Sequence, residues 1–559
     1  VYRQTNSGCD DLCVICIHEG FVMANEKVFS DPIYGQFSID ATCCLFVDTP
    51  EFQRLRDIKQ LGGTAFVYQS ANHTRFEHSL GVCHLASRWL DILQAAQPDL
   101  NITDQERLCV QLAGLCHDLG HGPFSHMFDA HFIKDSLPLG EKWNHENASN
   151  DMIDHIVKTH NLAPALQERG LSVPEDIDFI KTLIAGQPRI PGRKEFLYDI
   201  VANKRNNIDC DKFDYFQRDT LHLGLKMPFS ADRLMHCSRV VTVPYPTSNG
   251  NESSGGTNQQ SQQVIAFQEK EAYSVYELFQ TRYALHKKAY QHRVGQVVDL
   301  MHCEALKLAD PYLTIPSGDG IGTVRLSESI RDMSAYRFVT DAVFSLIAVH
   351  PDPRLAPAKA ILDDVKARRL YAFVGETLVQ PHHNIGENVS PVAGNKRNAS
   401  QMTMAQWKPG LPGLDDIKSA VLTLCNDSLA TASRSNNEEN LTVTCDDIFL
   451  ETATINYGCK AKNPVDRVHF YSRKAGLDAP FQMHPSQIGI CLPSTFEEKW
   501  IRLFCRHPEN VDMCSRLRKA WEKWCTSCVG KVSVSTPVKF SDGRPPPIPR
   551  TAVRKKLKM

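Results

Sequence analysis

Apolar residues recur at helical spacing over residues 28–225 of this 559-residue chain, which predicts a mostly helical region. In the clearest stretch Leu108, Leu112 and Leu115 fall on one helix face. The polar run DQER opens this helix, which is predicted to end near His117.

Two more helices follow from local signals. Residues 49–55 predict a helix start, because a threonine precedes a proline at the first helical position. Residues 203–220 are predicted to be helical, and Asp211, Tyr215 and Asp219 then share one face because they are spaced at i, i+4 and i+8.

The pattern changes after residue 230. Alternating apolar residues within 230–268 predict a short hairpin, whose connection at 247–263 is rich in Ser, Gly, Asn and Gln. A long helix is predicted at 273–309, followed by helices and short strands to about residue 371. We find no internal repeat. The expected fold is mostly α, with a smaller mixed α/β C-terminal region. The predicted parts are a leader at 1–26, a helical core at 27–380, a polar loop at 381–414, an α/β lobe at 415–530 and a Pro-rich, then basic, tail at 531–559.

The composition is ordinary for a soluble globular protein, with 42% hydrophobic and 23% charged residues. The formal net charge of -2 gives no overall field that would draw the chain to nucleic acid or membrane. No apolar run has the length of a membrane-spanning helix, and the first residues lack the layout of a signal peptide, so we expect no membrane partner.

The 19 cysteines favour buried reduced thiols over a disulfide framework, because many fall inside apolar helical runs. Two Cys-x-x-Cys pairs stand out, one at residues 13–16 and one at residues 525–528. Cys9 and His18 flank the first pair. A zinc knuckle is conceivable there, but neither pair has a partner at regular spacing.

Histidine and aspartate form the strongest chemical signal. The adjacent His117 and Asp118 offer one nitrogen and one oxygen ligand, and His78 upstream with Asp211 downstream would complete a mixed site. Such a site suits a divalent or non-haem transition metal with open positions for water and phosphate oxygens, and it tolerates Fe, Mn, Zn or Mg. Three more imidazoles follow the pair: His121, His126 and His145.

Five strings carry a resemblance to a known family. They are RFEHSLG (75–81), CHDLGHGPFSHMF (116–128), DCDKFDYF (209–216), TRYALHKKAYQH (281–292) and NPVD (463–466). These strings resemble the HD-domain deoxynucleoside triphosphate triphosphohydrolases, and most of all their animal branch, in which a SAM domain accompanies the HD domain. The resemblance covers roughly residues 27–530, and we expect no SAM domain in the short, polar residues 1–26.

The resemblance implies a metal site with a catalytic group beside it. The residues that match the family's metal ligands are His78, His117, Asp118 and Asp211. Those that match the catalytic group are His126, Asp129, His145 and Glu146. We expect His145 to act as the general acid, with His126 and Asp129 positioning it and the water, because an imidazole titrates near neutrality.

The resemblance also implies a nucleotide pocket. Arg75, Lys212 and Arg282 match a clamp for the triphosphate, whose negative charge needs cations. The residues that match the sugar contacts are Gln60, Leu61, Tyr215, Asp219, as acceptor for the 3′-hydroxyl, and Tyr290, which would exclude a 2′-hydroxyl. Further members with less defined contacts are His121, His286 and Gln291.

Two activator sites are implied as well. The first, for GTP or dGTP, matches Lys27, Val28, Asp48, Gln53, Arg56 and Arg368. The second, for a dNTP, matches Val67, Arg233, Lys270, His292, Arg293 and Arg473. The sequence departs from polar or basic family positions at Ser30, Gln268, Ser274 and Ala372, which puts the affinity and base preference of the second site in doubt.

The resemblance further implies a homotetramer assembled by nucleotides, a role in lowering dNTP pools, antiviral restriction, and a nuclear location with a cytoplasmic one possible. Single-stranded nucleic acid is a possible partner. Thr536 lies in the string TPVK, which fits a proline-directed cyclin-dependent kinase, although a plain Pro-rich tail is nearly as good an interpretation.

Two rival functions stay open at this point. One is another HD phosphohydrolase, such as a cyclic-nucleotide phosphodiesterase or a nuclease, and the sugar-reading residues argue against it. The other is a single-stranded nucleic-acid-binding protein with a vestigial site. The near-neutral charge and the complete ligand set argue against that role.

Overall fold

The computed structural model describes residues 26–187, 189–244, 261–318, 320–379, 413–432, 442–474, 476–489 and 492–528. Several predictions concern segments outside these residues. They are the leader with Cys9, its Cys-x-x-Cys pair and His18, most of the loop at 247–263, the polar loop at 381–414, and the tail with Thr536. Among the described helices none is long and apolar enough to cross a membrane.

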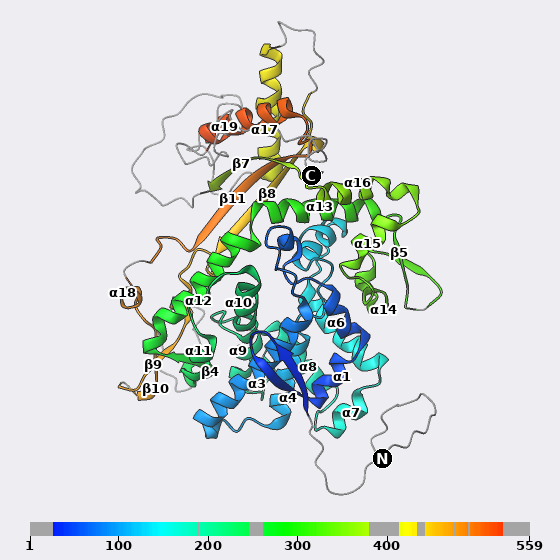
Figure 1. The fold of residues 1–559 in the computed structure, drawn as a ribbon. Coiled ribbons are helices and arrows are strands. Elements are labelled where there is room, and N and C mark those ends of the chain that lie inside the picture. The colour runs from blue at the N-terminus through cyan, green and yellow to red at the C-terminus, as the bar shows by residue number, and fades with distance from the viewer. Residues whose placement is uncertain are drawn as a thin grey trace, which may run out of the picture.

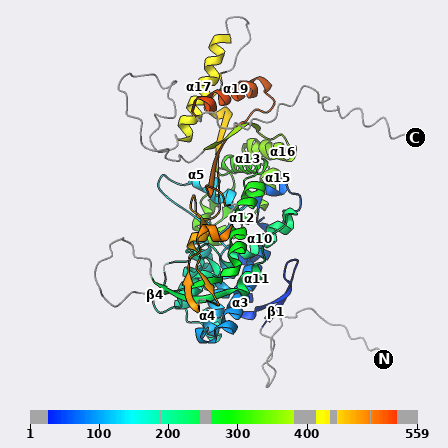
Figure 2. The same ribbon diagram turned by 90° about the vertical axis from the view of Figure 1, so that its left-hand side faces the viewer.

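The protein is mostly helical, as predicted, with small sheets that gather toward the C-terminal part. A helical body fills the lower part of Figure 1, and a smaller layer of strands with α17 and α19 lies above it. Figure 2 shows the same separation after a quarter turn.

The first half of the chain forms most of the body. Its helices are α1 (Ala41–Val47), α2 (Pro50–Gln53), α3 (Arg75–Ala96), α4 (Asp104–Cys116), α5 (Lys134–Ser136), α6 (His145–Thr159), α7 (Ala163–Glu168), α8 (Glu175–Ala185), α9 (Tyr198–Val201), α10 (Cys210–Leu223) and α11 (Ala231–His236). The long helix α3 packs against both α4 and α10, and one continuous apolar core joins them to the rest of the body.

Helix starts follow the expected capping chemistry. Thr49 caps α2 with Pro50 at the first position, as predicted. Thr103 caps α4 in a capping box with Glu106, and α4 ends immediately before His117 as expected. Each threonine side chain satisfies one of the four free N–H groups at its helix start.

Residues 28–225 are mostly helical as predicted, although β1 (Glu26–Asp31) and β2 (Gly35–Asp40) form an antiparallel hairpin at the start of this region. One boundary prediction is wrong. Helix α10 does not begin at residue 203. Asn203 Oδ1 accepts from the N–H groups of Arg205 and Asn206, so side-chain turns replace helical bonds until Asp209 caps the helix.

The predicted long helix at 273–309 is also wrong as a single element. The structure has α12 (Ala272–Leu285), a π-helical turn at His286–Tyr290, and α13 (Arg293–Ala309), for which His292 is the N-cap. His286, Tyr290 and Gln291, at and next to this break, line a cavity.

The predicted hairpin is confirmed as β3 (Ser238–Pro244) and β4 (Ser261–Gln268), which pair antiparallel. They join β9 (Phe470–Ser472) and β10 (Gly476–Phe481) in the order β10-β9-β4-β3. A further pair is β5 (Thr314–Pro316) with β6 (Thr323–Arg325). In chain order, α14 (Met333–Tyr336), α15 (Ala342–Val349) and α16 (Ala356–Lys366) follow β6, and α18 (Pro485–Ile488) follows β10.

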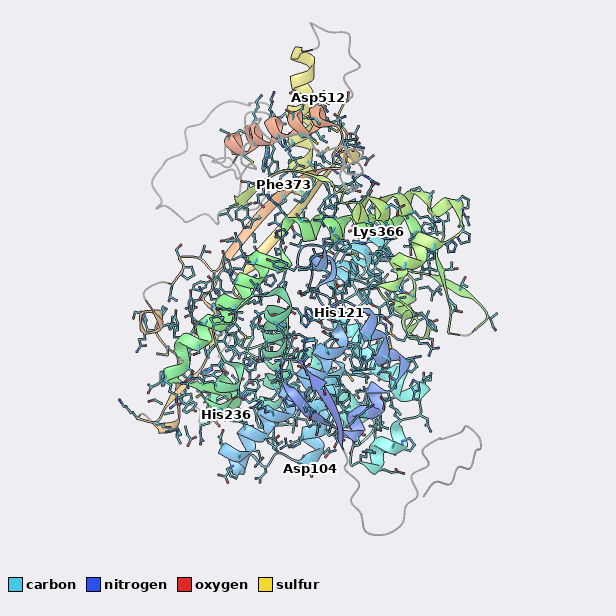
Figure 3. The ribbon with its side chains drawn as sticks, in the orientation of Figure 1. Asp104, His121, His236, Lys366, Phe373 and Asp512 are labelled. Atoms are coloured by element: carbon cyan, nitrogen blue, oxygen red, sulfur yellow. The ribbon has the colours of Figure 1, made fainter. Side chains whose placement is uncertain are left out.

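The upper layer has its own apolar core. Its sheet has the order β7-β11-β8, formed by β7 (Ala372–Val379), β11 (Glu497–Cys505) and β8 (Ile448–Asn456). Helices α17 (Leu414–Ala432) and α19 (Val511–Cys528) pack together against it. Phe373 and Asp512 mark this layer in Figure 3, whereas His121 lies near the centre of the molecule.

The cysteines whose side chains are described are free thiols, and all of them except Cys445 are buried. This agrees with the expected reduced thiols.

Candidate active site

Four predicted metal ligands meet where α3, α4 and α10 come together. His78 lies in the first turns of α3, His117 caps the C-terminal end of α4 with Asp118 next to it, and Asp211 lies in the first turn of α10. His78 Nε2 is 3.2 Å from His117 Nε2 and 3.3 Å from Asp211 Oδ1. Asp118 Oδ2 is 3.4 Å from the Nε2 atoms of both histidines.

The other ring nitrogen of each histidine is occupied. His78 Nδ1 lies 2.7 Å from Asp214 Oδ2, and Arg218 in turn donates two 2.9 Å hydrogen bonds to Asp214. His117 Nδ1 donates to the Gly114 carbonyl oxygen at 2.8 Å. These contacts fix both Nε2 atoms toward the carboxylates, in the arrangement that metal-binding histidines require.

The electrostatics of this cluster favour a cation. Burial opposes a charge on His78, but hydrogen bonds with Asp211 and Asp214 raise its pKa to about 10. Burial would also raise the pKa of Asp211, yet His117 and His78 lower it well below its ordinary value. The donor atoms of His78, His117 and Asp211 therefore lie together, with Asp118 Oδ2 beside both imidazoles, and this donor set fits a divalent metal.

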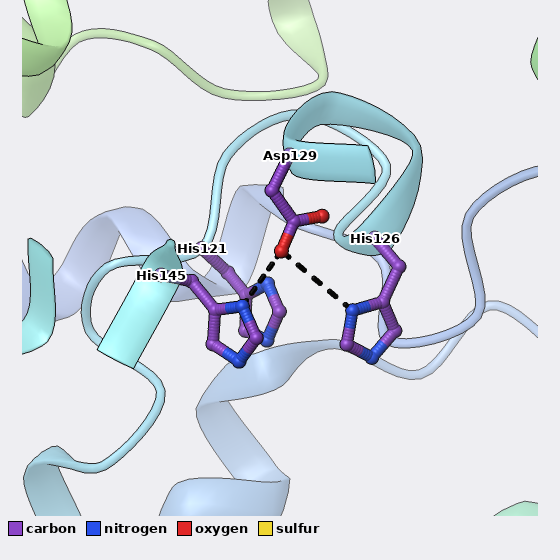
Figure 4. Close-up of side chains that lie close together, drawn as sticks. All are labelled: His121, His126, Asp129 and His145. Atoms are coloured by element: carbon purple, nitrogen blue, oxygen red, sulfur yellow. Dashed lines mark hydrogen bonds and ion pairs between the residues drawn. The ribbon is translucent and has the colours of Figure 1, made fainter. Parts of the chain in front are cut away.

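A second cluster lies beside the first and contains the predicted catalytic group. In Figure 4 the Asp129 carboxylate lies between two imidazoles. Its Oδ2 accepts from His145 Nδ1 at 2.7 Å and lies 3.8 Å from His126 Nδ1. His145 Nε2 is 3.8 Å from Glu146 Oε2.

The geometry of this second cluster suits proton transfer better than metal binding. The rings of His121 and His145 stack with centroids 3.8 Å apart and planes 17° from parallel. Stacked rings direct their in-plane lone pairs side by side rather than toward one point. Burial lowers the pKa of His145, but the bond to Asp129 and the nearby charges of Asp129, Glu146 and Asp118 together raise the pKa above the ordinary histidine value.

His121 connects the two clusters. Its Nε2 lies 3.4 Å from Asp118 Oδ1, and its ring is buried. Burial, Arg75 and His145 lower the pKa of His121 well below its ordinary value, which keeps this ring neutral.

A cavity of about 610 Å³ opens over both clusters. The predicted site residues that line it are Gln60, Leu61, Arg75, Asp118, His121, His126, His145, Asp211, Lys212, Tyr215, Asp219, Arg282, His286, Tyr290 and Gln291. The four that do not line it contact residues that do: His78, His117, Asp129 and Glu146. The size is within the range of sites for drug-sized ligands.

One part of the cavity wall is cationic. Arg75 donates to Asp118 Oδ2 at 2.6 Å, which lowers the pKa of this carboxyl well below its ordinary value against the effect of burial. Lys212 Nζ lies 3.0 Å from Asp209, and Arg282 donates to Asn456 Oδ1 at 2.9 Å. Three cations held in place by these contacts could meet a polyanion without rearrangement.

Another part of the wall carries uncharged and carboxylate groups. Tyr215 and Asp219 share the cavity-facing side of α10, as predicted from their spacing. Tyr290 donates to Asp219 Oδ2. Gln60 is buried, and its Oε1 has no hydrogen-bond partner among the described residues. Such a buried orphan oxygen is typical of a site that is completed by a ligand.

Several lining residues were missed from the sequence, and Asp299 is the most distinctive. Its Oδ1 accepts from the Gly63 N–H at 2.9 Å, and burial raises its pKa to about 8. It lies on α13, within the segment where a continuous helix was expected, so its direction toward the cavity had no sequence signal. The others include Asn207, whose φ of 62° places it in a turn, and Phe124.

The predicted activator residues lie elsewhere and make different contacts. Lys27 pairs with Asp48 at 2.9 Å, and both side chains are largely exposed, at 49% and 59%. Arg56 donates to Gln53 Oε1 at 2.8 Å, and Arg368 donates to the Phe66 carbonyl oxygen, next to Val67.

The second predicted activator set is also engaged locally. Arg233 binds Glu271 at 2.6 Å, His292 caps α13, and the Arg293 guanidinium lies over the Phe373 ring. Val28 and Lys270 are exposed, as is Arg473. None of these activator residues lines the large cavity.

The fold and the His/Asp cluster define an HD-domain protein, and the HD domain family model matches residues 75–186. The chain is 38% identical over 512 residues to the deoxynucleoside triphosphate triphosphohydrolase SAMHD1 of Danio rerio, covering 89% of this chain and 74% of the relative. It is 37% identical to the human protein of the same name, with 89% and 73% covered. A Dictyostelium discoideum SAMHD1 homolog is 33% identical, with 89% and 80% covered. The chain therefore belongs to the SAMHD1 family of deoxynucleoside triphosphate triphosphohydrolases.

Proposed function

We propose that this protein hydrolyses a dNTP at the α-phosphorus and releases a deoxynucleoside and intact triphosphate. The observation that carries the proposal is one cavity that joins the His/Asp cluster, three cations and a set of uncharged groups suited to a sugar. The names of the SAMHD1 relatives support the same substrate class.

The proposed metal holders are His78, His117, Asp118 and Asp211, whose donor atoms already converge. Fe, Zn or Mn suits this set, with Mg²⁺ accompanying the triphosphate. When bound, such a cation supplies Lewis acidity toward water and the phosphoryl oxygens.

The chain's own residues supply proton transfer and charge. Water attacks the α-phosphorus, the bond from phosphorus to the 5′-oxygen breaks, and that oxygen needs a proton. His145 is anchored through Nδ1 by Asp129, so its Nε2 is the atom that can deliver this proton. Arg75, Lys212 and Arg282 offset the charge of the departing triphosphate.

The opposite part of the cavity would read the sugar. Asp219 accepts the 3′-hydroxyl, Gln60 and Leu61 contact the sugar, Tyr215 packs on it, and the Tyr290 ring occupies the space that a 2′-hydroxyl needs. This arrangement disfavours a cyclic-nucleotide phosphodiesterase and a nuclease, because neither reaction requires exclusion of a 2′-hydroxyl.

The direct test is to incubate the metal-loaded protein with dGTP and separate the products. Triphosphate and deoxyguanosine support the proposal, whereas pyrophosphate or a monophosphate would assign a different phosphohydrolase reaction. Binding of single-stranded nucleic acid without any dNTP turnover would favour the binding-protein alternative.

We also propose that GTP or dGTP, together with a dNTP, activates the enzyme by assembling a homotetramer. The exposed Lys27, Asp48 and Arg56 offer a guanine reader and phosphate partners that are accessible to a nucleotide. Sedimentation with GTP alone, and then with GTP and each dNTP, tests this. A tetramer with full activity in the absence of nucleotide would contradict it.

A further inference from the structure

A buried histidine outside the predicted site lies directly behind the proposed sugar acceptor. His73 Nε2 is 2.7 Å from Asp219 Oδ1, and the two side chains are 0% and 2% exposed. Tyr290 donates to the other oxygen of the same carboxylate. Asp219 is thus held from two sides before any substrate arrives.

The hydrogen bond defines the tautomer of His73. An ionised carboxylate only accepts, so Nε2 carries the hydrogen and donates it to Asp219. His73 Nδ1 is buried and has no hydrogen-bond partner among the described residues. Within the described residues, the one hydrogen bond of the His73 ring is therefore to Asp219.

The ring is also fixed mechanically. It stacks on His222 with centroids 4.3 Å apart and planes 16° from parallel, and His222 Nδ1 in turn contacts the Ser70 carbonyl oxygen at 3.2 Å. A ring confined in this way holds its Nε2–H direction and leaves the carboxylate little freedom to rotate.

The backbone of His73 reaches a second sugar-facing residue. The Gln60 N–H donates to the His73 carbonyl oxygen at 3.0 Å, and the Gln60 side chain lines the cavity with an unpartnered Oε1. One loop residue therefore holds both polar groups that would face the sugar hydroxyl.

We propose that His73 is a positioning residue that orients the Asp219 carboxylate for the substrate's 3′-hydroxyl and so sets selectivity for 3′-hydroxyl over 3′-deoxy nucleotides. The inference rests on the proposed dNTP triphosphohydrolase function. Each carboxylate oxygen keeps a lone pair beyond its bond to His73 or Tyr290, and the hydroxyl can donate to it.

The test compares kcat/KM for a dNTP with that for the matching 2′,3′-dideoxynucleoside triphosphate. We expect His73→Leu to lower kcat/KM for the dNTP about 10-fold, mostly through KM. This factor is at the low end of the loss expected when a hydrogen bond to a charged group is removed. The dideoxy substrate should keep its wild-type value, so the ratio of the two falls toward one. His73→Gln should recover much of the ratio, because its side-chain amide can donate near the position of Nε2.

A matched control is His160→Leu. His160 Nε2 also holds a buried carboxylate, Glu51, at 2.8 Å, but outside the cavity. This variant should lose stability and keep the wild-type ratio. If His73→Leu does not fold, His73→Asn replaces it, because its shorter amide cannot reach Asp219.

The outcomes separate the two proposals. A wild-type enzyme that releases no triphosphate from a dNTP contradicts the proposed function. A wild-type enzyme that cleaves the dNTP but does not discriminate against the dideoxy substrate contradicts the role of His73, as does a His73 variant that retains full discrimination.

Discussion

The candidate catalytic cavity and the proposed activator surface around Lys27 and Asp48 differ in how complete they are within one chain. At the cavity, His78 and Asp118 have side chains only 1% and 6% exposed, and each group has fixed partners. On the activator surface, Lys27 and Asp48 are about half exposed and pair with each other. Transition-state stabilisation requires groups that are oriented and shielded in advance, whereas a regulatory nucleotide requires accessible groups.

The proposed chemistry and the proposed regulation therefore depend on different states of the protein, the single chain and the nucleotide-bridged assembly. The chemistry needs a metal and a cavity that a single chain already builds. The regulation needs residues on separate elements, which bind other groups of the same chain in this structure, to be joined by nucleotides between subunits. Changes at the cavity should therefore reduce catalysis itself, and changes at the surface should alter its dependence on activators.

The largest expected effect is at Asp211. Asp211→Ala removes one of four converging ligands, so metal content and activity should fall to background while the circular dichroism spectrum stays unchanged. Mass spectrometry of bound metal, alongside an activity assay, measures both. Asp178→Ala, at an exposed acid of α8, is the control. Full activity of the Asp211 variant would refute the ligand assignment.

The next effect is at His145. His145→Ala should slow the chemical step roughly 100- to 10,000-fold, with little change in metal content or dNTP affinity, because only proton transfer is lost. Single-turnover kinetics isolate this step. A variant that no longer binds metal would show that His145 is a ligand instead.

A smaller effect should appear in the pH profile. The bond to Asp129 raises the pKa of His145 against burial, so the protonated imidazole persists to higher pH and activity is lost as the pH rises through that pKa. Asp129→Asn removes this cause and leaves burial, which lowers the pKa. The alkaline limb of kcat should therefore move to lower pH. An unmoved limb would mean that another group controls it.

The smallest effect on catalysis itself concerns the proposed second activator site. The resemblance puts Gln268 and Ala372 in or near positions where the family places cations, and each missing contact to phosphate is typically worth about 1.5–3 kcal/mol. Gln268→Arg combined with Ala372→Lys should therefore lower the dNTP concentration needed for tetramer formation, while kcat of the assembled enzyme stays the same. Sedimentation with GTP and increasing dATP measures this. Wild-type protein that assembles fully at low micromolar dATP would show that the two substitutions have no effect.

The sequence predicted which residues share one cavity better than it predicted where helices begin and end. The face shared by Tyr215 and Asp219 was predictable because helical periodicity is local. The break at His286–Tyr290 was not, because its sequence HKKAY holds no proline or glycine that would mark a helix end. It coincides with contacts from the distant sheet, where Arg502 donates to the Gln291 carbonyl oxygen at 2.6 Å.

The same limit explains the missed residues. Asp299 and His73 carry no motif, and their importance comes from what they face after folding. Asp299 lies against the Gly63 N–H, and His73 against Asp219. Both contacts join segments far apart in the sequence, which no local pattern reports.

The most direct test of the central claim is hydrolysis of dGTP in water labelled with oxygen-18. Attack at the α-phosphorus breaks the bond to the 5′-oxygen, so the label should appear only in inorganic triphosphate, with unlabelled deoxyguanosine released in equal amount. Label in the deoxynucleoside, or labelled pyrophosphate or orthophosphate as the first product, would contradict the proposed reaction.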